Sequence, residues 1–177
     1  LNVLAAACVA AAMGATLEGI RAAATTFEGL PHRMEDCGLL DGVRWLNSSM
    51  CTNPAAGRAA VRAVGEKYPS IVIAGGADKG MDFQAWGEAV AGAARTLILI
   101  GQDAPVLAEA ARAAGMADIR HAATLQDAME LARSLSRPGD AVILAPAMAS
   151  FGEFTNFRDR GQKFRETVEQ FCTEAGQ

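Results

Sequence analysis

Three short segments without a charged residue constrain the fold of this 177-residue chain more than any other feature. They are SIVIA (70–74), TLILI (96–100) and AVILA (141–145), and helical patterns lie between and after them. Strands that are apolar throughout are typical of parallel sheets that helices cover on both faces. Their alternation with helices indicates βαβ units. The sequence therefore predicts a three-layer α/β/α Rossmann-like domain with a mostly parallel sheet.

The first thirty residues differ from the rest in pattern. Two alanine-rich helices are predicted over 1–13 and 16–26, and the Gly-Pro pair in GLPHR (29–33) predicts a turn. We therefore expect a helical fragment over 1–30 and the α/β domain over 31–177. The chain does not begin with Met, and we expect it to start within a longer protein.

A β-hairpin is expected at the start of the α/β domain. RMEDC (33–37) and VRWLN (43–47) flank LLDG, whose Asp-Gly pair is a strong hairpin signal. The remaining predicted elements are helices 54–67, 82–94, 103–115, 124–136 and 155–174, and a short strand at 119–121.

Composition excludes several classes of function. Hydrophobic residues make up 51% and charged residues 20% of the chain, which is typical of a globular protein, and the net charge of −4 gives no reason to expect nucleic acid or an anionic membrane. The opening LNVLAAACVAAAMG lacks a basic start and is too short to span a bilayer, so we expect a buried helix. Four cysteines without a CxxC pair favour free thiols in a reducing cytoplasm.

Three loops that follow strands hold the residues most suited to binding. They are SSMCTNP (48–54), GGADKGMD (75–82) and PAMASFGEF (146–154), whereas GQDAP (101–105) is interpreted as an ordinary turn. Ligands bind beyond the carboxyl ends of parallel strands, so the three loops are expected to share one rim. Gly75 and Gly76 would let backbone N–H groups approach an anion. The chain has neither GxxxxGK[ST] nor GxGxxG, and so no triphosphate cradle of its own.

Simpler interpretations of single residues remain open at this point. Asn53 before Pro54 is typical of a helix cap, and Thr52 could cap or contact a ligand. Lys79, one of three lysines, could be a solvated loop residue. Cys51 is interpreted as a buried thiol rather than a nucleophile. His32 and His121 have no partners at metal-ligand spacing, so no metal site is expected within the chain.

Five segments, in order, carry a resemblance to a known family: LNVLAAACVAA, TTFEGLPHRME, VRWLNSSMCTNP, GGADKGMDF and APAMASFGEFTNFRDRGQKF. They resemble the Mur ligases, and within them the branch that adds D-glutamate. The resemblance implies a three-domain enzyme that joins an amino acid to the carboxylate of a UDP-MurNAc-type peptidoglycan precursor. It does so through an ATP-derived acyl phosphate with Mg²⁺, and this chain would be the C-terminal domain after the end of the central ATP-binding domain.

The resemblance also implies roles for single residues. Lys79, Thr52, Ser150 and Phe157 match positions that hold the amino acid, and Asn2 and Arg33 match nucleotide contacts. The enzyme would be a cytoplasmic monomer, and the fragment alone inactive.

The chain departs from the family pattern in its first loop. Ser48 and Met50 stand where the family has an acid and a lysine, which puts nucleotide contacts from this loop in doubt. Two alternatives therefore stay open: a related ligase with another acceptor or amino acid, and a binding module without catalysis. A third alternative, which does not depend on this loop, is a dinucleotide-binding oxidoreductase. The missing GxGxxG opposes the last of these.

Overall fold

The computed structural model describes residues 2–175, and the chain forms two compact units that meet between Leu30 and Pro31. The first unit holds α1 (Asn2–Ala12) and α2 (Leu17–Thr26). Thr16 caps α2, because its hydroxyl accepts a hydrogen bond from the N–H of Gly19 at 3.1 Å.

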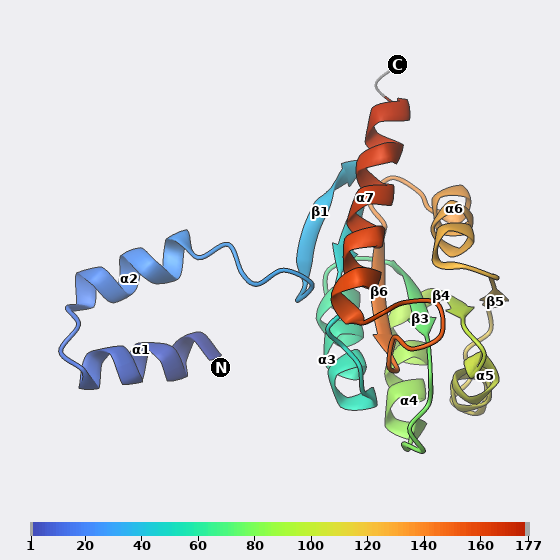
Figure 1. Ribbon diagram of the computed structural model, residues 1–177, viewed down its shortest axis with the longest axis horizontal. Coiled ribbons are helices and arrows are strands. Elements are labelled where there is room, and N and C mark those ends of the chain that lie inside the picture. Colours follow the sequence, from blue (N-terminus) through green and yellow to red (C-terminus); the bar gives the residue numbers. More distant parts are fainter. Residues whose placement is uncertain (1, 176–177) are drawn as a thin grey trace. The chain divides into compact units, whose positions relative to one another are not determined.

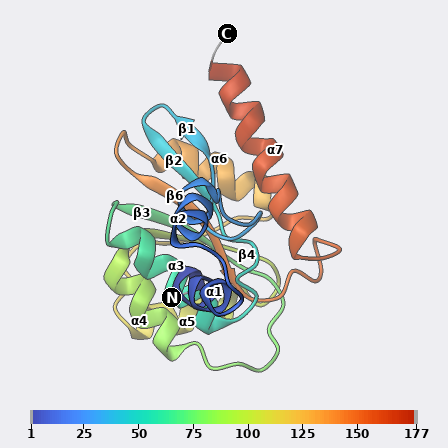
Figure 2. The ribbon, with the colours of Figure 1, turned by 90° about the vertical axis from the view of Figure 1, so that its left-hand side faces the viewer.

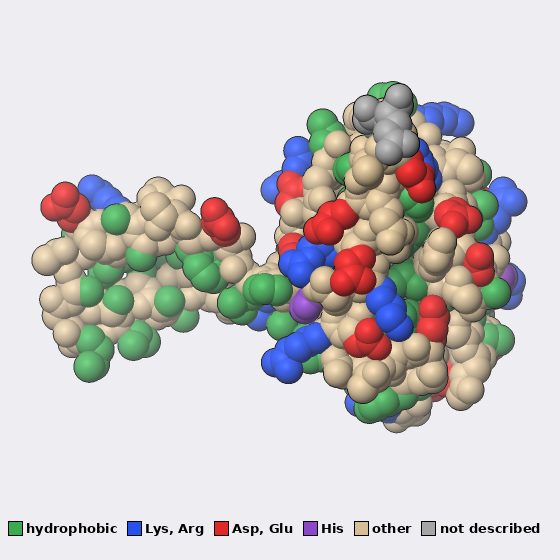
Figure 3. Space-filling model, turned by 45° about the horizontal axis from the view of Figure 1, so that its top comes forward, with side chains coloured by type: hydrophobic (Ala, Val, Ile, Leu, Met, Phe, Trp, Pro, Cys, Tyr) green, Lys and Arg blue, Asp and Glu red, His purple; other side chains and the backbone are tan. Residues whose placement is uncertain are grey.

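The predicted burial of the first helix is not found within this unit. Neither α1 nor α2 buries any residue, and hydrophobic side chains gather on the surface of the unit, which carries few charges (Figure 3). Two helices alone cannot cover each other's apolar faces, which is the physical reason for the difference. The exposed large hydrophobic residues of the unit are Val3, Leu4, Val9, Met13, Leu17, Phe27 and Leu30.

The second unit is built on a six-stranded sheet in the order β1-β2-β6-β3-β4-β5 (Figure 1). β1 pairs antiparallel with β2, and all other neighbours are parallel, as the apolar segments predict. The strands are β1 (Glu35–Leu40), β2 (Val43–Asn47), β3 (Ser70–Gly75), β4 (Ala94–Ile100), β5 (Ile119–His121) and β6 (Ala141–Ala147).

The hairpin is confirmed, but its first strand was predicted with wrong bounds. β1 begins at Glu35 and continues to Leu40, whereas 33–37 was expected. The turn consists only of Asp41 and Gly42, with φ of 51° and 78°, and Leu40 pairs with Val43. Two residues with positive φ match the twist of the flanking strands, so the tight turn extends the ladder through Leu40.

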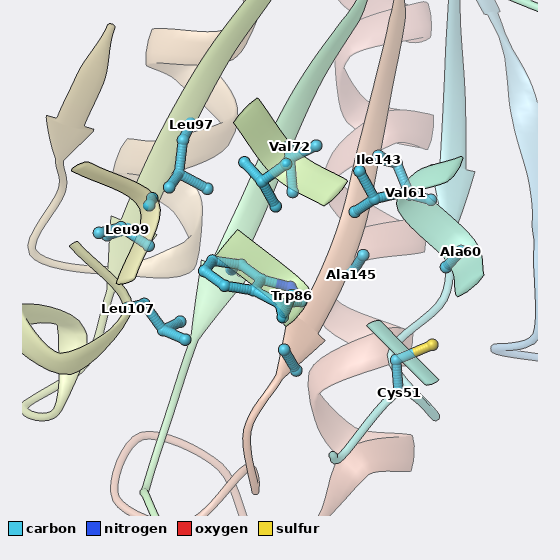
Figure 4. Close-up of a cluster of buried hydrophobic side chains, with 14 of the residues drawn as sticks. Cys51, Ala60, Val61, Val72, Trp86, Leu97, Leu99, Leu107, Ile143 and Ala145 are labelled. Atoms are coloured by element: carbon cyan, nitrogen blue, oxygen red, sulfur yellow. The ribbon is translucent and has the colours of Figure 1, made fainter. Parts of the chain in front are cut away.

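Helices cover both faces of the sheet (Figures 1 and 2). The elements α3 (Pro54–Gly65), α4 (Gln84–Ala93) and α5 (Ala104–Ala113) pack on one face, and α6 (Leu125–Leu135) and α7 (Phe157–Ala175) on the other. Each face has its own hydrophobic core. Trp86 lies at the centre of the first, among side chains of β3, β4, β6 and α5 (Figure 4). The predicted three-layer architecture is therefore confirmed.

The second core depends on the C-terminal helix. The ring of Trp45 lies 6.0 Å from that of Phe164 and 5.7 Å from that of Phe171, centroid to centroid. Burying a phenylalanine side chain contributes about 1.5–3 kcal/mol to stability. The packing fixes α7, whose first turn lies at the carboxyl end of the sheet. No helix in residues 2–175 is long and apolar enough to cross a membrane.

Candidate ligand site

The three predicted loops meet at the carboxyl ends of β2, β6 and β3, which are neighbours in the sheet. The second and third loops are joined directly. The N–H of Ala77 donates to the oxygen of Ala149 at 2.9 Å, and the N–H of Ala149 donates to the oxygen of Ala77 at 3.1 Å. The expectation of a shared rim is therefore confirmed for these loops.

Gly75 and Gly76 are required by close packing of the backbone. Their φ values are 131° and 140°, and an added Cβ would lie 2.0 Å from the oxygen of Ile100 and 2.0 Å from that of Ala149, respectively. No side chain fits at such distances. Packing therefore accounts for both glycines: Gly75 lets the end of β3 approach the end of β4, and Gly76 lets it approach the loop after β6. The approach of an anion to their N–H groups stays a prediction.

The loop that carries Lys79 is shaped by two aspartates. One carboxylate oxygen of Asp78 accepts from the N–H groups of Gly80 at 3.0 Å and Met81 at 3.2 Å. The N–H of Asp78 donates to the carboxylate of Asp103 at 2.8 Å. The segment 101–105, interpreted from sequence as an ordinary turn, therefore supports the loop. Lys79 itself is exposed, and its Nζ lies 5.8 Å from the centroid of the Phe151 ring.

The first loop leads into α3 through the predicted cap. The side chain of Asn53 accepts from the N–H of Ala56 at 2.9 Å, and Pro54 begins the helix. The cap is therefore made by Asn53 and not by Thr52, which is half-buried beside it.

Cys51 and Ser48 are internal residues of the first loop. The Ser48 hydroxyl lies 3.2 Å from the thiol of Cys51, and both side chains are buried. Burial raises the pKa of the Cys51 thiol, and the contact with Ser48 offsets this only in part. The thiol is thus protonated near neutral pH, which agrees with the interpretation as a buried thiol.

Arg160 connects all three loops and was not predicted from sequence. Its guanidinium is fully buried, and it donates to the hydroxyl of Ser49 at 3.1 Å, to the oxygen of Ser49 at 3.1 Å, to that of Gly75 at 3.3 Å and to that of Met148 at 3.3 Å. Burial lowers the pKa of Arg160 to about 10, so the group stays charged near neutral pH. The only sequence signal was its place in the motif NFxxRG.

Phe157 starts α7 at the edge of this cluster. Its carbonyl oxygen accepts from the Ser49 hydroxyl at 2.7 Å, and its ring packs edge-on against the ring of His32, 6.4 Å between centroids. Asn156 caps the helix by accepting from the N–H groups of Arg158 at 2.8 Å and Asp159 at 3.1 Å.

His32 is a structural residue beside the rim. Its Nδ1 lies 3.0 Å from the Asn47 amide nitrogen, which also donates to Glu35 and to the oxygen of Gly161, each at 3.0 Å. Burial lowers the pKa of His32, and the Glu35 charge opposes this. A Cβ at Gly161 would lie 2.3 Å from the His32 ring, so the glycine is needed for this contact.

The four predicted site residues other than Thr52 and Lys79 lie in different surroundings. Ser150 is buried and lines a cavity of about 230 Å³ together with Gln102 and Phe151. Phe157 is half-buried near Ser49, and Arg33 is exposed next to His32. Asn2 lies exposed in the first unit. No group of three or more His, Cys, Asp or Glu side chains in the described part of the chain could hold a metal ion.

The fold and the rim define a class of protein: an α/β domain with loops at the carboxyl ends of its central strands, which is where parallel sheets of this kind bind ligands. Residues 32–148 match the family described as "Mur ligase, glutamate ligase domain". The chain therefore belongs to the Mur ligase family, as the sequence motifs predicted.

Curated relatives point to one branch of this family. The chain is 44% identical over 169 residues to UDP-N-acetylmuramoylalanine–D-glutamate ligase of Symbiobacterium thermophilum, covering 95% of this chain and 37% of the relative. It is 46% identical over 170 residues to the ligase of the same name from Marinobacter nauticus, covering 95% and 37%. The chain thus spans little more than a third of the length of these relatives.

Solved structures share the fold at low sequence identity. MurF ligase from Thermotoga maritima in complex with ADP matches with a TM-score of 0.70 and 15% identity, covering 98% of this chain and 38% of that one. Folylpolyglutamate synthase of Mycobacterium tuberculosis complexed with ADP matches with a TM-score of 0.63 and 20% identity, covering 90% and 37%.

Proposed function

We propose that this chain is the amino-acid-binding part of an ATP-dependent ligase that adds D-glutamate to a UDP-MurNAc-type peptidoglycan precursor in the bacterial cytoplasm. The observation that carries the proposal is the joined rim: loops bearing Thr52, Lys79 and Ser150 are tied together at the carboxyl ends of adjacent strands. The family match and the names of the relatives support the same class of reaction.

The rim residues fit an amino acid chemically. The Lys79 ammonium pairs with a carboxylate, and the hydroxyls of Thr52 and Ser150 donate hydrogen bonds to its oxygens. The N–H groups of Arg158 and Asp159 at the start of α7 already donate to Asn156, so the donors of the rim are Lys79 and the two hydroxyls. These donors fit one carboxylate of an amino acid, and the names of the relatives support D-glutamate as that amino acid. The domain would hold the amine of the amino acid in position to attack an acyl phosphate. It would thus contribute to catalysis by orienting the substrate.

ATP and Mg²⁺ do not fit this chain by itself. Residues 2–175 contain no acidic or histidine cluster for a metal and no phosphate loop. We infer that both are held mainly by a central ATP-binding domain, of which residues 1–30 are the end. The proposed nucleotide contacts are Asn2 in the first unit and Arg33 in the second. In this arrangement the exposed apolar residues of α1 and α2 would be covered by the rest of that domain.

A phosphate-release assay on the full-length protein tests the proposal. With ATP, Mg²⁺ and UDP-MurNAc-L-alanine, D-glutamate should stimulate phosphate release, and L-glutamate and D-alanine should not. If only another amino acid stimulates phosphate release, that amino acid is the substrate and D-glutamate is not.

A non-catalytic binding module is the second candidate, favoured by the first loop. Ser48 is buried against Cys51, and Met50 carries no charge, so the loop offers neither an acid nor a lysine. A protein of this kind would bind D-glutamate in calorimetry and release no phosphate in the assay above.

A further inference from the structure

Arg160 is the one fully buried charge among the described residues, and its surroundings are unusual. Its four acceptors are three backbone oxygens and one hydroxyl, all of them neutral. Burial has the largest effect and lowers the pKa of Arg160, and the nearby Cys51 and Glu153 oppose this only in part. A buried cation is normally paired with a carboxylate, because leaving it uncompensated is unfavourable.

The hydrogen bonds of Arg160 reach each loop of the rim at a different point. Ser49 lies after β2, Gly75 ends β3, and Met148 follows β6. The planar guanidinium has five donors in a fixed fork, so a single side chain can set the spacing of three loops. The same Ser49 hydroxyl donates to the Phe157 carbonyl oxygen. This hydrogen bond connects the start of α7 to the three loops.

We propose that Arg160 is a positioning residue of the ligand site: it holds the three loops in one geometry, and its charge, which no carboxylate of the described residues pairs with directly, favours an anionic ligand at the rim. The inference rests on the proposed function for the identity of the ligand, a dicarboxylic amino acid. The role of Arg160 in joining the loops stands apart from that identity.

Two substitutions separate the two roles. Arg160→Lys keeps the charge but cannot bridge three loops, whereas Arg160→Gln removes the charge as well. Arg112→Lys, an exposed arginine in the last turn of α5, is the matched control. The full-length protein is used throughout.

Hydrogen–deuterium exchange without any substrate tests the joining of the loops. In Arg160→Lys, peptides covering 47–53, 75–82 and 146–154 should all exchange faster, while peptides of β5 and α6 should not change. Unchanged exchange in the three loops would overturn the joining role, whichever substrate the protein uses. If both Arg160 variants fail to fold, Ser49→Ala removes one hydroxyl of the network and should loosen the first loop and the start of α7.

Steady-state kinetics test the effect on the ligand, with D-glutamate as the probe. Arg160→Lys should raise the KM for D-glutamate about tenfold, and Arg160→Gln about a further tenfold, with the KM for ATP unchanged in both. Equal values in the two variants would overturn the role of the charge. If the wild-type protein shows no stimulation by any amino acid, the proposed function fails, and the exchange result still decides whether Arg160 joins the loops.

Discussion

The hydroxyl of Ser49 donates to the carbonyl oxygen of Phe157 at 2.7 Å and at the same time accepts from Nε of Arg160 at 3.1 Å. Two residues 108 positions apart are thereby joined at the point where the first loop meets the start of α7. The contact links the position of the first loop to the packing of the C-terminal helix. Substitutions of the residues that form it should therefore affect stability as well as binding.

Ser49→Ala should lower the free energy of unfolding by about 1–3 kcal/mol, because it leaves the buried Nε–H of Arg160 without a partner and removes the hydrogen bond to the Phe157 carbonyl. Urea denaturation followed by circular dichroism measures the change. Ser134→Ala is the control, since its hydroxyl bonds to the Leu131 oxygen on the exposed side of α6. Equal stability of the two variants would contradict the importance of the network.

Gly76→Ala should be strongly destabilising. The positive φ alone costs roughly 1–3 kcal/mol for a residue with a side chain, and the Cβ would also collide with the oxygen of Ala149. Gly92→Ala is the matched control, because its Cβ would meet nothing within 4 Å. That variant should unfold at the wild-type temperature or slightly above it. A Gly76→Ala protein with wild-type thermal stability would show that the close approach is not needed.

Acidification should destabilise the fold through His32. Burial holds the pKa of this residue below its ordinary value of 6.5, against the opposing charge of Glu35 and with the aid of Arg165 and Arg158. As the pH falls below 6.5, the unfolded chain binds the proton first, so the free energy of unfolding decreases until the folded pKa is reached. At pH values above 6.5 this contribution to the free energy of unfolding is retained.

Urea titrations at pH 7.5 and 5.5 measure this effect against His32→Gln, whose amide oxygen can still accept from Asn47. The wild-type protein should lose more stability between the two pH values than the variant. The same loss in both proteins would assign the pH dependence to other groups.

Cys51 should resist alkylation. Its thiol is buried with a raised pKa, and the pKa of Cys37 is raised to about 12, also chiefly by burial, whereas Cys172 is exposed. With iodoacetamide at pH 7.5, peptide mass spectrometry should find Cys172 modified and the other two thiols modified only after unfolding. Faster modification of Cys51 than of Cys172 would revive its interpretation as a nucleophile.

The sequence predicted those parts of the fold that depend on local signals. Apolar strands, the Asp41–Gly42 turn and the Asn53 cap each follow from a few neighbouring residues, and the structure confirms them. The end of β1 was predicted wrongly because two leucines, Leu39 and Leu40, can lie in a loop as well as in a strand. Register across the hairpin, set by the pairing of Leu40 with Val43, decided that point.

The organisation of the rim could not be predicted locally. Arg160 is one of many arginines in the sequence, and its partners lie 12 to 111 residues away. The packing role of Gly75 and Gly76 likewise depends on Ile100 and Ala149, which only the folded sheet brings next to them. Such contacts between distant segments follow from strand order, which composition does not reveal.

The central claim is that the rim holds the carboxylate of an amino acid at Lys79, and Lys79→Ala in the full-length protein tests it most directly. Loss of one charge-assisted hydrogen bond of about 1.5–3 kcal/mol predicts a KM for D-glutamate raised at least tenfold, with the KM for ATP unchanged. Lys67→Ala, an exposed lysine between α3 and β3, should behave as the wild-type protein. An unchanged KM for D-glutamate in Lys79→Ala would contradict the account.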